Sequence, residues 1–248
     1  MSIEIIKNKD VKLDIPSFTC DENAVGEHLN SHPLLQLLNV YGFLTIIGRP
    51  GSGKTSVAIS LITQKNPKIY RKTNHHIYIF MPENSLASLE KNPFKVLEKD
   101  NIYHELNEAT ILNVFKKIDA NSKKGEKSLI LIDDMTASLK ASITIVKAFK
   151  DLVFNRRHLK CNIIMTVQSF VNIPLDIRKN IQNMILFKPS KKEFELIFDE
   201  LLEMKKEIAG LIMKYVYDDD NHNFLFVNIP NQRMFKNFTE EIKLIDVE

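Results

Sequence analysis

A glycine-rich loop that ends in lysine and threonine constrains this chain more than any other feature of its sequence. Residues 48–55 read Gly-Arg-Pro-Gly-Ser-Gly-Lys-Thr and match the pattern G-x-x-x-x-G-K-[ST] in full. The segment 42–47 before the loop is apolar, as in a buried strand, and the segment 54–63 after it has helical periodicity. We therefore predict a nucleotide-binding loop made of these residues: Gly48, Arg49, Pro50, Gly51, Ser52, Gly53, Lys54, Thr55 and Ser56.

The chemistry of this loop depends on its backbone and on two side chains. Backbone N–H groups and the N-terminus of the following helix can surround phosphate oxygens. Lys54 supplies positive charge to those oxygens, and the Thr55 hydroxyl can bind Mg²⁺. The chain has only 7 glycines, and three of them lie in this loop, which argues against an accidental glycine turn. ATP and Mg²⁺ are the expected cofactors.

The rest of the chain alternates short apolar segments with amphipathic ones. This rhythm is typical of parallel βαβ units, so we expect an α/β P-loop NTPase fold with a RecA-like, mainly parallel central sheet and helices on both faces. Further strands are predicted at 76–81, 128–132, 162–167, 184–187 and 223–228. Helices are predicted near 108–118, 142–158 and 191–202, while 211–217 is either helical or the start of an edge pair. Residues 1–40 do not follow the rhythm, and we expect them to be an N-terminal extension that packs on the core domain (41–248) or on a neighbouring subunit.

Two adjacent acidic residues follow the buried strand Leu-Ile-Leu-Ile at 129–132. A carboxylate at the carboxyl end of a parallel strand lies beside the P-loop, where Mg²⁺ binds. Asp133 is expected to hold the metal through water, and Asp134 to orient and activate the attacking water. A solvated turn is the alternative for such a strand end. After a complete P-loop, the pair favours hydrolysis over phosphate transfer to a small molecule.

Two further positions fit a nucleotide site that is shared between subunits. Gln168 follows the apolar strand 163–167 and can sense the γ-phosphate or position the water, unless it is only a polar strand end. Arg156 and Arg157 end the predicted helix 142–158. An arginine placed there can stabilise transition-state charge in a neighbour's site, or it can simply complement the helix macrodipole.

Composition excludes several classes of protein. A net charge of +3 permits a nucleic-acid partner without arguing for one, so DNA contact would come from local basic patches. Lys123, Lys124 and Lys127 could touch a phosphate backbone, although a basic turn of this kind is more often simply solvated; Lys140 is a further weak candidate. Cys20 and Cys161 form no CxxC pair, which argues against a disulfide framework or a cysteine zinc site. No stretch approaches the roughly 18 apolar residues of a membrane span, and the first residues lack a signal-peptide layout. There is no Asn-Lys-x-Asp motif of Ras-type GTPases, and no arginine-rich lid of a small nucleotide kinase.

The motifs together resemble the genome-packaging ATPases of large DNA viruses and virophages, the poxvirus-type enzymes within the FtsK–HerA superfamily of DNA translocases. The resemblance covers about residues 40–230. It rests on the P-loop, the Ile-Leu-Ile-Asp-Asp segment at 130–134, the Arg157–Gln168 spacing and the segments 80–85, 92–94 and 168–180. The stretch 168–180, which runs from Gln168 to Asn180 and includes Arg178, is the specific part.

The resemblance implies a function and assigns roles to residues. It implies an ATP-driven double-stranded DNA translocase that packages a viral genome, forms a hexameric or pentameric ring, contacts capsid or portal proteins, and works in the host cytoplasm, the viral factory or the virion. Lys54 and Thr55 would bind nucleotide and Mg²⁺, Asp133 the metal, Asp134 would be the catalytic acid and Gln168 the sensor. Arg157, eleven positions before the glutamine, would be the arginine acting in trans, with Arg156 as the alternate.

One departure from the family keeps other functions open. The catalytic acid in these enzymes is often glutamate, whereas this chain has Asp134, whose shorter side chain alters how water is held. A nucleotide-dependent switch or assembly scaffold with little turnover is therefore the main alternative. A small-molecule kinase is a third possibility, which would require phosphate transfer to a nucleoside or sugar.

Overall fold

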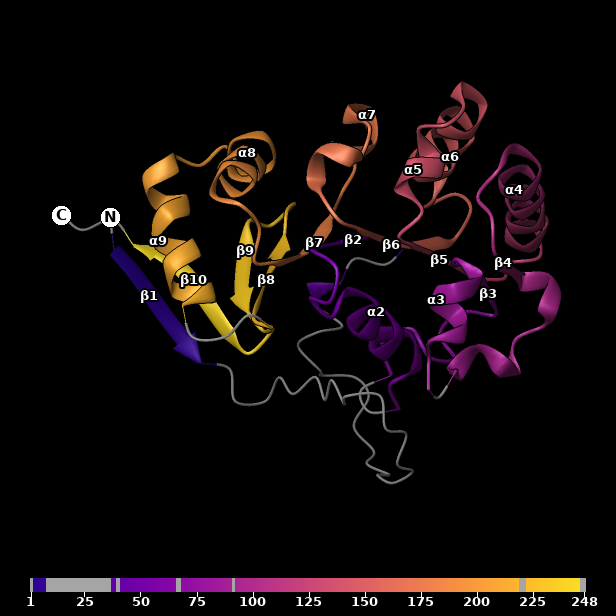
Figure 1. Cartoon of the computed structure of the whole chain (residues 1–248), viewed down its shortest axis with the longest axis horizontal. Coiled ribbons are helices and arrows are strands. Elements are labelled where there is room, and N and C mark those ends of the chain that lie inside the picture. Colours follow the sequence, from indigo (N-terminus) through magenta and orange to yellow (C-terminus); the bar gives the residue numbers. More distant parts are fainter. Residues whose placement is uncertain are drawn as a thin grey trace.

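A single mixed sheet organises the molecule (Figure 1). The computed structural model describes residues 2–7, 37–38, 41–65, 68–90, 92–218 and 222–245. The strands within these residues are β1 (Ser2–Lys7), β2 (Phe43–Ile47), β3 (His76–Phe80), β4 (Ile102–Tyr103), β5 (Ser128–Asp133), β6 (Cys161–Val167), β7 (Asn183–Phe187), β8 (Phe224–Asn228), β9 (Arg233–Lys236) and β10 (Glu240–Ile245). Their order across the sheet is β1-β10-β9-β8-β7-β2-β6-β5-β3-β4.

The larger part of the sheet is parallel, which confirms the predicted fold class. The neighbours from β7 to β4 in that order all pair in parallel. Antiparallel strands β8, β9, β10 and β1 extend the sheet beyond β7. Because parallel strands point the same way, the carboxyl ends of β2, β6 and β5 meet at one edge of the sheet and their amino ends at the other.

Helices cover both faces of this sheet. They are α2 (Lys54–Thr63), α3 (Glu83–Ala87), α4 (Glu108–Lys123), α5 (Thr136–Leu139), α6 (Ile143–Asn155), α7 (Leu175–Arg178), α8 (Lys191–Leu202) and α9 (Lys206–Tyr217), with short 3₁₀ turns η1 (Pro93–Val96), η2 (Lys99–Asn101) and η3 (Phe170–Asn172). In Figure 1, α2 and α3 lie on one face and α4 to α9 on the other. None of the helices in these described ranges is both long and apolar enough to cross a membrane.

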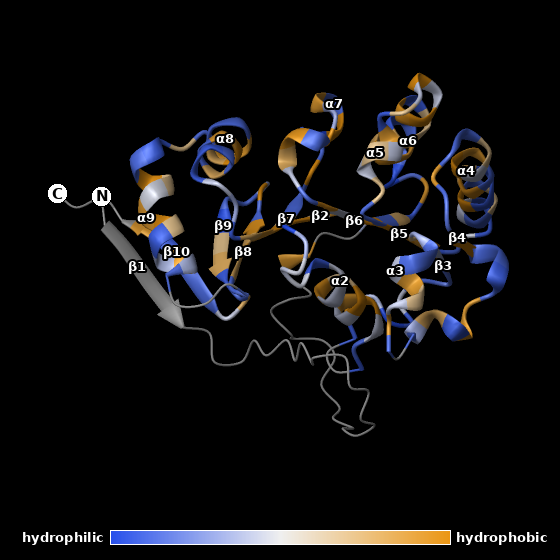
Figure 2. Ribbon diagram, in the orientation of Figure 1, coloured by the Kyte–Doolittle hydropathy of each residue, from blue (hydrophilic) through white to orange (hydrophobic). Residues whose placement is uncertain are grey.

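The core forms two layers because strand side chains alternate between the two faces. On β2, Phe43 and Ile47 pack toward the α6 side, where the rings of Phe43 and Phe149 meet edge to face at 6.2 Å. Leu44 and Ile46 pack toward α2. Figure 2 shows the matching pattern on the long helices, which carry both hydrophobic and hydrophilic sides. The central strands are buried on both faces, and for that reason their sequences read as continuous apolar runs.

The helix predicted at 142–158 begins as expected but ends earlier. The Ser142 hydroxyl accepts a hydrogen bond from the Thr144 N–H at its start. The last helical residue is Asn155, and residues 156–160 turn back so that the Cys161 N–H donates to the Arg156 carbonyl at 2.8 Å. Lys160 has a positive φ of 49°, which closes the turn. The segment 211–217 lies within helix α9, so the helical alternative is the correct one.

The antiparallel end of the sheet includes elements that the sequence did not predict. Strands β9 and β10 mix charged with apolar residues over short segments, a weaker signal than the buried runs of the parallel strands. Strand β1 pairs along its whole length with β10. It therefore places residues 2–7 of the expected N-terminal extension in the sheet. Leu37 and Leu38 join the core on the α2 side, while 8–36 and 39–40 of that extension lie outside the described residues.

Candidate functional site

The glycine loop connects β2 to α2 and has backbone geometry that its glycines make possible. The Gly48 N–H donates to the Val167 carbonyl at 3.1 Å, which ties the loop to the end of β6. A Cβ at Gly48 would lie 2.5 Å from Ser52 Oγ and 2.8 Å from Phe187 Cβ, so no larger residue fits. Gly51 and Gly53 have φ angles of 77° and 101°, which only glycine adopts readily.

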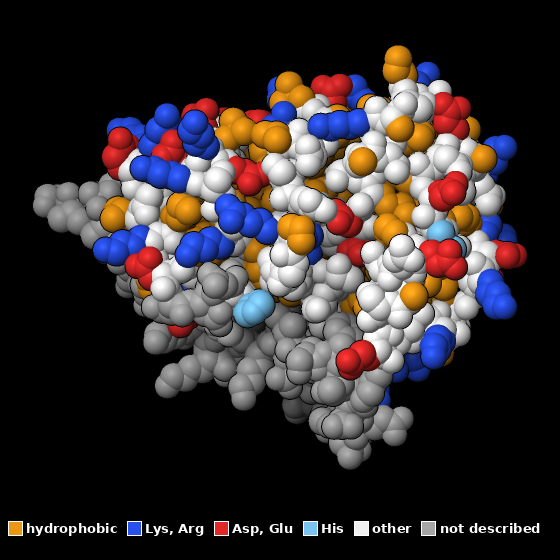
Figure 3. All heavy atoms as spheres, viewed as in Figure 1, with side chains coloured by type: hydrophobic (Ala, Val, Ile, Leu, Met, Phe, Trp, Pro, Cys, Tyr) orange, Lys and Arg blue, Asp and Glu red, His pale blue; other side chains and the backbone are white. Residues whose placement is uncertain are grey.

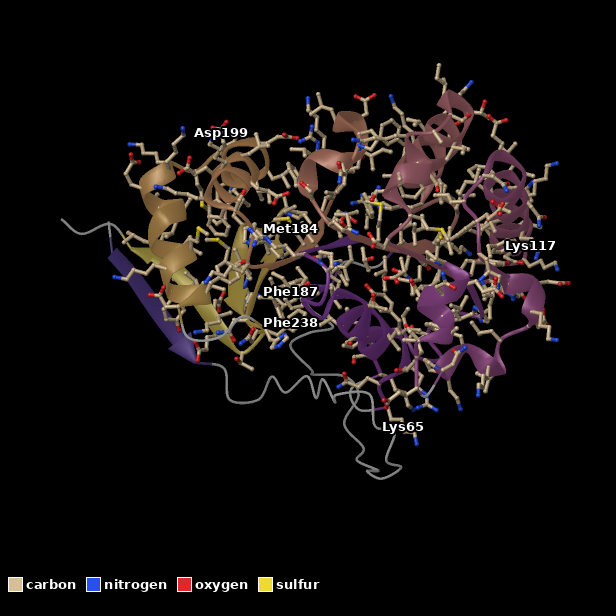
Figure 4. All side chains as sticks on the ribbon, viewed as in Figure 1. Lys65, Lys117, Met184, Phe187, Asp199 and Phe238 are labelled. Carbon is tan, nitrogen blue, oxygen red and sulfur yellow. The ribbon has the colours of Figure 1, made fainter. Side chains whose placement is uncertain are left out.

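A cluster of aromatic side chains packs against this loop. Phe187, at the end of β7, lies 3.6 Å from where a Cβ of Gly53 would be. Its ring meets that of Phe224 at 5.6 Å, and Phe224 meets Phe238 at 5.0 Å. Figure 4 shows Phe187 and Phe238 close together beside α2. The antiparallel strands therefore help to hold the nucleotide loop, although they contribute none of its predicted ligands.

Lys54 begins α2 and turns its side chain back into the loop. Its ammonium group donates to the Arg49 carbonyl at 2.9 Å, and the residue is buried. Burial lowers the pKa of Lys54, and the nearby carboxylates of Asp134 and Asp133 oppose that shift. The positive charge is thus held inside the loop, where the phosphates of a nucleotide would meet it.

Asp133 lies at the centre of a hydrogen-bonded group of hydroxyls. Thr55 Oγ1 lies 2.9 Å and 3.1 Å from its two carboxylate oxygens, and the buried Thr166 hydroxyl donates to Oδ1 at 2.8 Å. Asp133 and Thr166 are direct neighbours in the register of β5 and β6. Burial raises the pKa of Asp133, while the hydrogen bonds from Thr166 and Thr55 act to lower it.

Asp134 and Gln168 contact each other at the carboxyl ends of the same two strands. The Gln168 amide donates to the Asp134 carboxylate at 2.8 Å, and both residues are exposed. Asp134 has a φ of 52°, and its N–H donates to Thr166 Oγ1 at 3.0 Å. The structure therefore brings together all the acidic and amide residues predicted for the site. It adds Thr166, whose only signal in the sequence is a polar residue inside the apolar run 161–167.

The loop after Gln168 is fastened to α8, which sequence reasoning missed. The Glu193 carboxylate accepts hydrogen bonds of 2.6 Å from both the Ser169 hydroxyl and the Phe170 N–H. Arg178 pairs with Glu200 at 2.9 Å and stacks over the Phe170 ring at 4.8 Å. Arg178, whose role the sequence left open, therefore packs on this loop instead of pointing at the nucleotide loop.

The two arginines lie at the opposite edge of the sheet. They precede β6, whereas Gln168 follows it, and a seven-residue strand is about 23 Å long. Arg156 is buried, and its Nη1 donates to the Val153 carbonyl of its own helix at 2.6 Å. Burial, followed by repulsion from Arg157, lowers the pKa of Arg156. Arg157 is exposed. Neither side chain lies near the glycine loop of the same chain.

The donor set fits a magnesium nucleotide. The Thr55 hydroxyl and the Asp133 carboxylate are hard oxygen ligands of the kind that Mg²⁺ prefers. Within the described ranges, no three His, Cys, Asp or Glu side chains gather into a metal site of their own. A cation here would therefore take its remaining ligands from phosphate and water, as is usual for Mg²⁺ in phosphate-binding sites.

Comparisons with known proteins agree with this geometry. The family model described as "Poxvirus A32 protein" matches residues 34–228. B204, the DNA-packaging ATPase of Sulfolobus turreted icosahedral virus, superimposes with a TM-score of 0.59 at 18% identity, covering 80% of this chain and 98% of B204. B204 of Sulfolobus turreted icosahedral virus 2, in complex with AMP, gives 0.58 at 17% identity, covering 84% and 100%.

A further solved structure matches with a lower TM-score. ATPases 2 and 3 of EssC from Geobacillus thermodenitrificans give a TM-score of 0.52 at 16% identity, covering 84% of this chain and 40% of that one. No curated protein matches the sequence significantly. Likeness at these identities shows the fold, and the family model, which spans well over half of the chain, shows the family. The chain therefore belongs to the Poxvirus A32 protein family, and its fold and nucleotide loop are those of a P-loop ATPase.

Proposed function

We propose that this chain is an ATP-driven translocase of double-stranded DNA that packages a viral genome into its capsid. The observation that carries the proposal is the group formed by Thr55, Asp133, Thr166, Asp134 and Gln168 beside the glycine loop. Such an arrangement supports hydrolysis of a magnesium nucleotide. Membership of the Poxvirus A32 family, and the fold shared with a DNA-packaging ATPase, support DNA as the substrate on which the hydrolysis acts.

The proposed mechanism assigns one task to each side chain. Lys54 and the loop N–H groups would bind the β- and γ-phosphates, and Thr55 and Asp133 would hold Mg²⁺, which would neutralise phosphate charge. Asp134 orients the attacking water and accepts its proton. Gln168, whose amide lies 2.8 Å from the Asp134 carboxylate, senses the γ-phosphate and changes position when that phosphate is released. Glu193 holds the loop after Gln168, so that a movement there reaches α8.

The proposed site also includes an arginine from a second subunit. Arg157 is exposed, and it lies at the amino end of β6, away from the nucleotide loop of its own chain. An arginine in that position can stabilise the transition state only in another subunit. We assign this role to Arg157 and not to the buried Arg156. A head-to-tail contact of this kind repeats around a ring, and a hexamer or pentamer of this chain would complete its sites in that way.

A triplex-displacement assay tests translocation directly. A third-strand oligonucleotide is annealed at the end of a duplex, and its release is followed after the protein and ATP are added. The expected result is ATP-dependent release that requires Lys54 and is absent with the Lys54→Ala variant. Steady ATP hydrolysis without any release, under conditions in which the duplex is bound, would rule out translocation.

The alternative, a nucleotide switch or scaffold with little turnover, makes a different prediction for Asp134. The Asp134 carboxylate accepts a hydrogen bond from Gln168. A nucleotide switch that does not hydrolyse ATP needs no residue to accept a proton from water. If the chain is an ATPase motor, Asp134→Asn abolishes steady hydrolysis while ATP binding persists. If it is a switch, the variant and the parent protein hydrolyse ATP equally slowly and support assembly equally well.

A further inference from the structure

Three loops with many lysines and arginines converge at the edge of the sheet opposite the nucleotide site. Loop 68–75 precedes β3, loop 123–127 precedes β5 and loop 156–160 precedes β6. These strands are direct neighbours and run in parallel, so the three loops lie side by side across about 10 Å of the sheet edge. We call them together the amino-edge surface.

The charge of the amino-edge surface is far from the average of the chain. It contains nine basic residues and one acidic residue, Glu126; the basic residues are Lys68, Arg71, Lys72, Lys123, Lys124, Lys127, Arg156, Arg157 and Lys160. The chain as a whole has 34 basic and 31 acidic residues. The rest of the chain therefore carries 25 basic against 30 acidic residues, so the small net charge of +3 conceals a strongly positive edge on an otherwise acidic protein.

Lysines elsewhere are not segregated in this way. Figure 3 shows lysines and arginines gathered over α8 and α9, with acidic side chains between them. Residues 188–218 hold six lysines and seven acidic residues. Lys140, which the sequence suggested as a DNA contact, lies at the carboxyl edge, where its ammonium group donates to the Val171 carbonyl at 3.3 Å. The other three suggested lysines all belong to the amino-edge surface.

Hydrogen bonds between the loops make this surface a fixed platform. The His75 N–H donates to the Lys127 carbonyl at 2.8 Å, and the Lys127 N–H donates to His75 Nδ1 at 2.9 Å. The Ser128 N–H donates to the Lys160 carbonyl at 3.0 Å. Glu126, the one acidic residue, is paired with His76 at 2.8 Å. Arg156 is buried and Lys123, at the end of α4, pairs with Asp119, so the positive charge toward solvent rests on the remaining basic residues, of which Lys72 and Lys124 are exposed.

We propose that the amino-edge surface binds the phosphate backbone of double-stranded DNA, a surface assignment that rests on the proposed function. The loops before β3 and β5 would make the contact, while Arg157, in the third loop, reaches the neighbouring subunit. Duplex DNA carries one negative charge per roughly 1.7 Å of axis, so a patch of this width meets several phosphates. The contact uses no base edges, which suits a motor that moves along any sequence.

The position of this surface connects DNA contact to hydrolysis. Strand β5 joins Lys127 to Asp133, and β6 joins Lys160 to Gln168. Each strand is buried and paired on both sides, and in the proposed motor these two strands would connect a displacement at the carboxyl end to the amino end. Nucleotide phosphates and DNA phosphates would thus be held at opposite ends of the same strands.

Charge reversal at two positions tests this surface. The test variant is Lys72→Glu/Lys124→Glu, and the matched control is Lys192→Glu/Lys205→Glu, which makes the same change in charge at exposed positions of α8 and the start of α9. Binding of a fluorescein-labelled 30-base-pair duplex of arbitrary sequence is measured by anisotropy over a salt series. Binding of a fluorescent ATP analogue and a thermal melt confirm that each variant is folded.

The result expected is a loss of DNA affinity of about tenfold or more in the test variant at low salt, with a slope of log K against log salt that is smaller by about 2. The control keeps the affinity and slope of the parent. Equal DNA binding by parent and test variant would overturn the surface assignment and leave the proposed function standing. Absence of duplex binding by the parent itself would overturn the proposed function.

One competing role for this surface has a separate readout. If the loops before β3 and β5 dock instead on a second copy of the chain, the test variant keeps its DNA affinity but sediments as a smaller species than the parent in the presence of ATP analogue. That outcome would also overturn the assignment to DNA. If the test variant assembles like the parent but no longer binds DNA, the result supports the assignment of this surface to DNA.

Discussion

At the scale of single residues, the Thr166 hydroxyl joins the two acidic residues of the site. It donates to the Asp133 carboxylate and accepts from the Asp134 N–H, at 2.8 Å and 3.0 Å. One buried hydroxyl therefore contacts both the Asp133 carboxylate and the left-handed turn from which Asp134 reaches Gln168.

Replacing Thr166 should show whether its hydroxyl positions the two acidic residues or its side chain only fills space in the core. Thr166→Val keeps the shape of the side chain but removes both hydrogen bonds, and a lost hydrogen bond to a charged group costs about 1.5–3 kcal/mol. We expect kcat to fall about 10- to 100-fold and the Mg²⁺ concentration for half-maximal binding of a fluorescent ATP analogue to rise. Thr166→Ser should recover both values. A valine variant with parental Mg²⁺ dependence would exclude this role.

The loop glycines should differ in what they tolerate. At Gly48 a methyl group would overlap Ser52 and Phe187, so Gly48→Ala should destabilise the fold by about 1–3 kcal/mol and weaken ATP binding. At Gly51 there is open space, and only the positive φ penalises alanine, by about 1–2 kcal/mol. Thermal melts with and without ATP measure both effects. Larger loss of ATP binding at Gly51 than at Gly48 would contradict the packing argument.

Most residues of the candidate site could be placed from the sequence, because each occupies a fixed place relative to the glycine loop or a strand end. Lys54 and Thr55 follow the glycines, and Asp133, Asp134 and Gln168 follow buried strands. Thr166 and Glu193 could not be predicted in the same way. Their roles depend on strand register and on the packing of α8, and a single sequence contains neither.

At the scale of secondary-structure elements, several contacts hold α8 and the loop after Gln168 together. Glu193 binds Ser169 and Phe170, and Glu200 binds Arg178, which stacks on Phe170. The loop that follows Gln168, the proposed γ-phosphate sensor, is therefore linked to the helical layer by two carboxylates on one helix. A change in the position of Gln168 would reach helix α8 through these contacts.

Removing the charge of Glu193 should weaken catalysis more than binding. Glu193→Gln weakens both short hydrogen bonds of the carboxylate, and we expect kcat to fall about tenfold while KM for ATP stays near the parental value. Asp199→Asn, on the exposed side of the same helix, is the matched control and should leave kcat unchanged. A parallel loss of thermal stability and KM, without a selective loss of kcat, would indicate that Glu193 only supports the fold.

The elements themselves were predictable to different degrees. The longer parallel strands and helices α2 and α8 follow from apolar runs and helical periodicity, whereas the two-residue strand β4 was not predicted and a helix was only one of two alternatives for α9. The early end of α6 depends on the turn at 156–160, in which Lys160 adopts a left-handed conformation that its residue type does not signal. Strands β9, β10 and β1 are held by pairing with their neighbours at this end of the sheet, and such short strands with many charged residues have little apolar signal of their own.

At the scale of the whole molecule, the two edges of the sheet carry different chemistry. The carboxyl edge holds the nucleotide loop and the acidic pair, and the amino edge holds Arg157 and the basic loops. In the proposed arrangement, the chain completes its site only when a second copy is placed against it. The proposed ring and the proposed DNA contact both follow from this polarity.

Mixing two inactive variants tests the shared site. Lys54→Ala removes phosphate binding and Arg157→Ala removes the arginine of the neighbour, so each variant alone should be inactive. Mixed rings should recover partial turnover, because some sites combine an intact Lys54 with an intact Arg157. Sedimentation must show that mixed rings form. Mixed rings without recovered activity would count against Arg157 acting in trans.

We propose that ATP hydrolysis belongs to an assembled ring that is coupled to DNA. The ATPase rate per subunit, measured against protein concentration with and without double-stranded DNA, tests this directly. The rate per subunit should rise with concentration as shared sites form, and DNA should raise the rate further and shift the rise to lower protein concentration. A rate per subunit that is constant over the whole concentration range and unchanged by DNA would contradict the account.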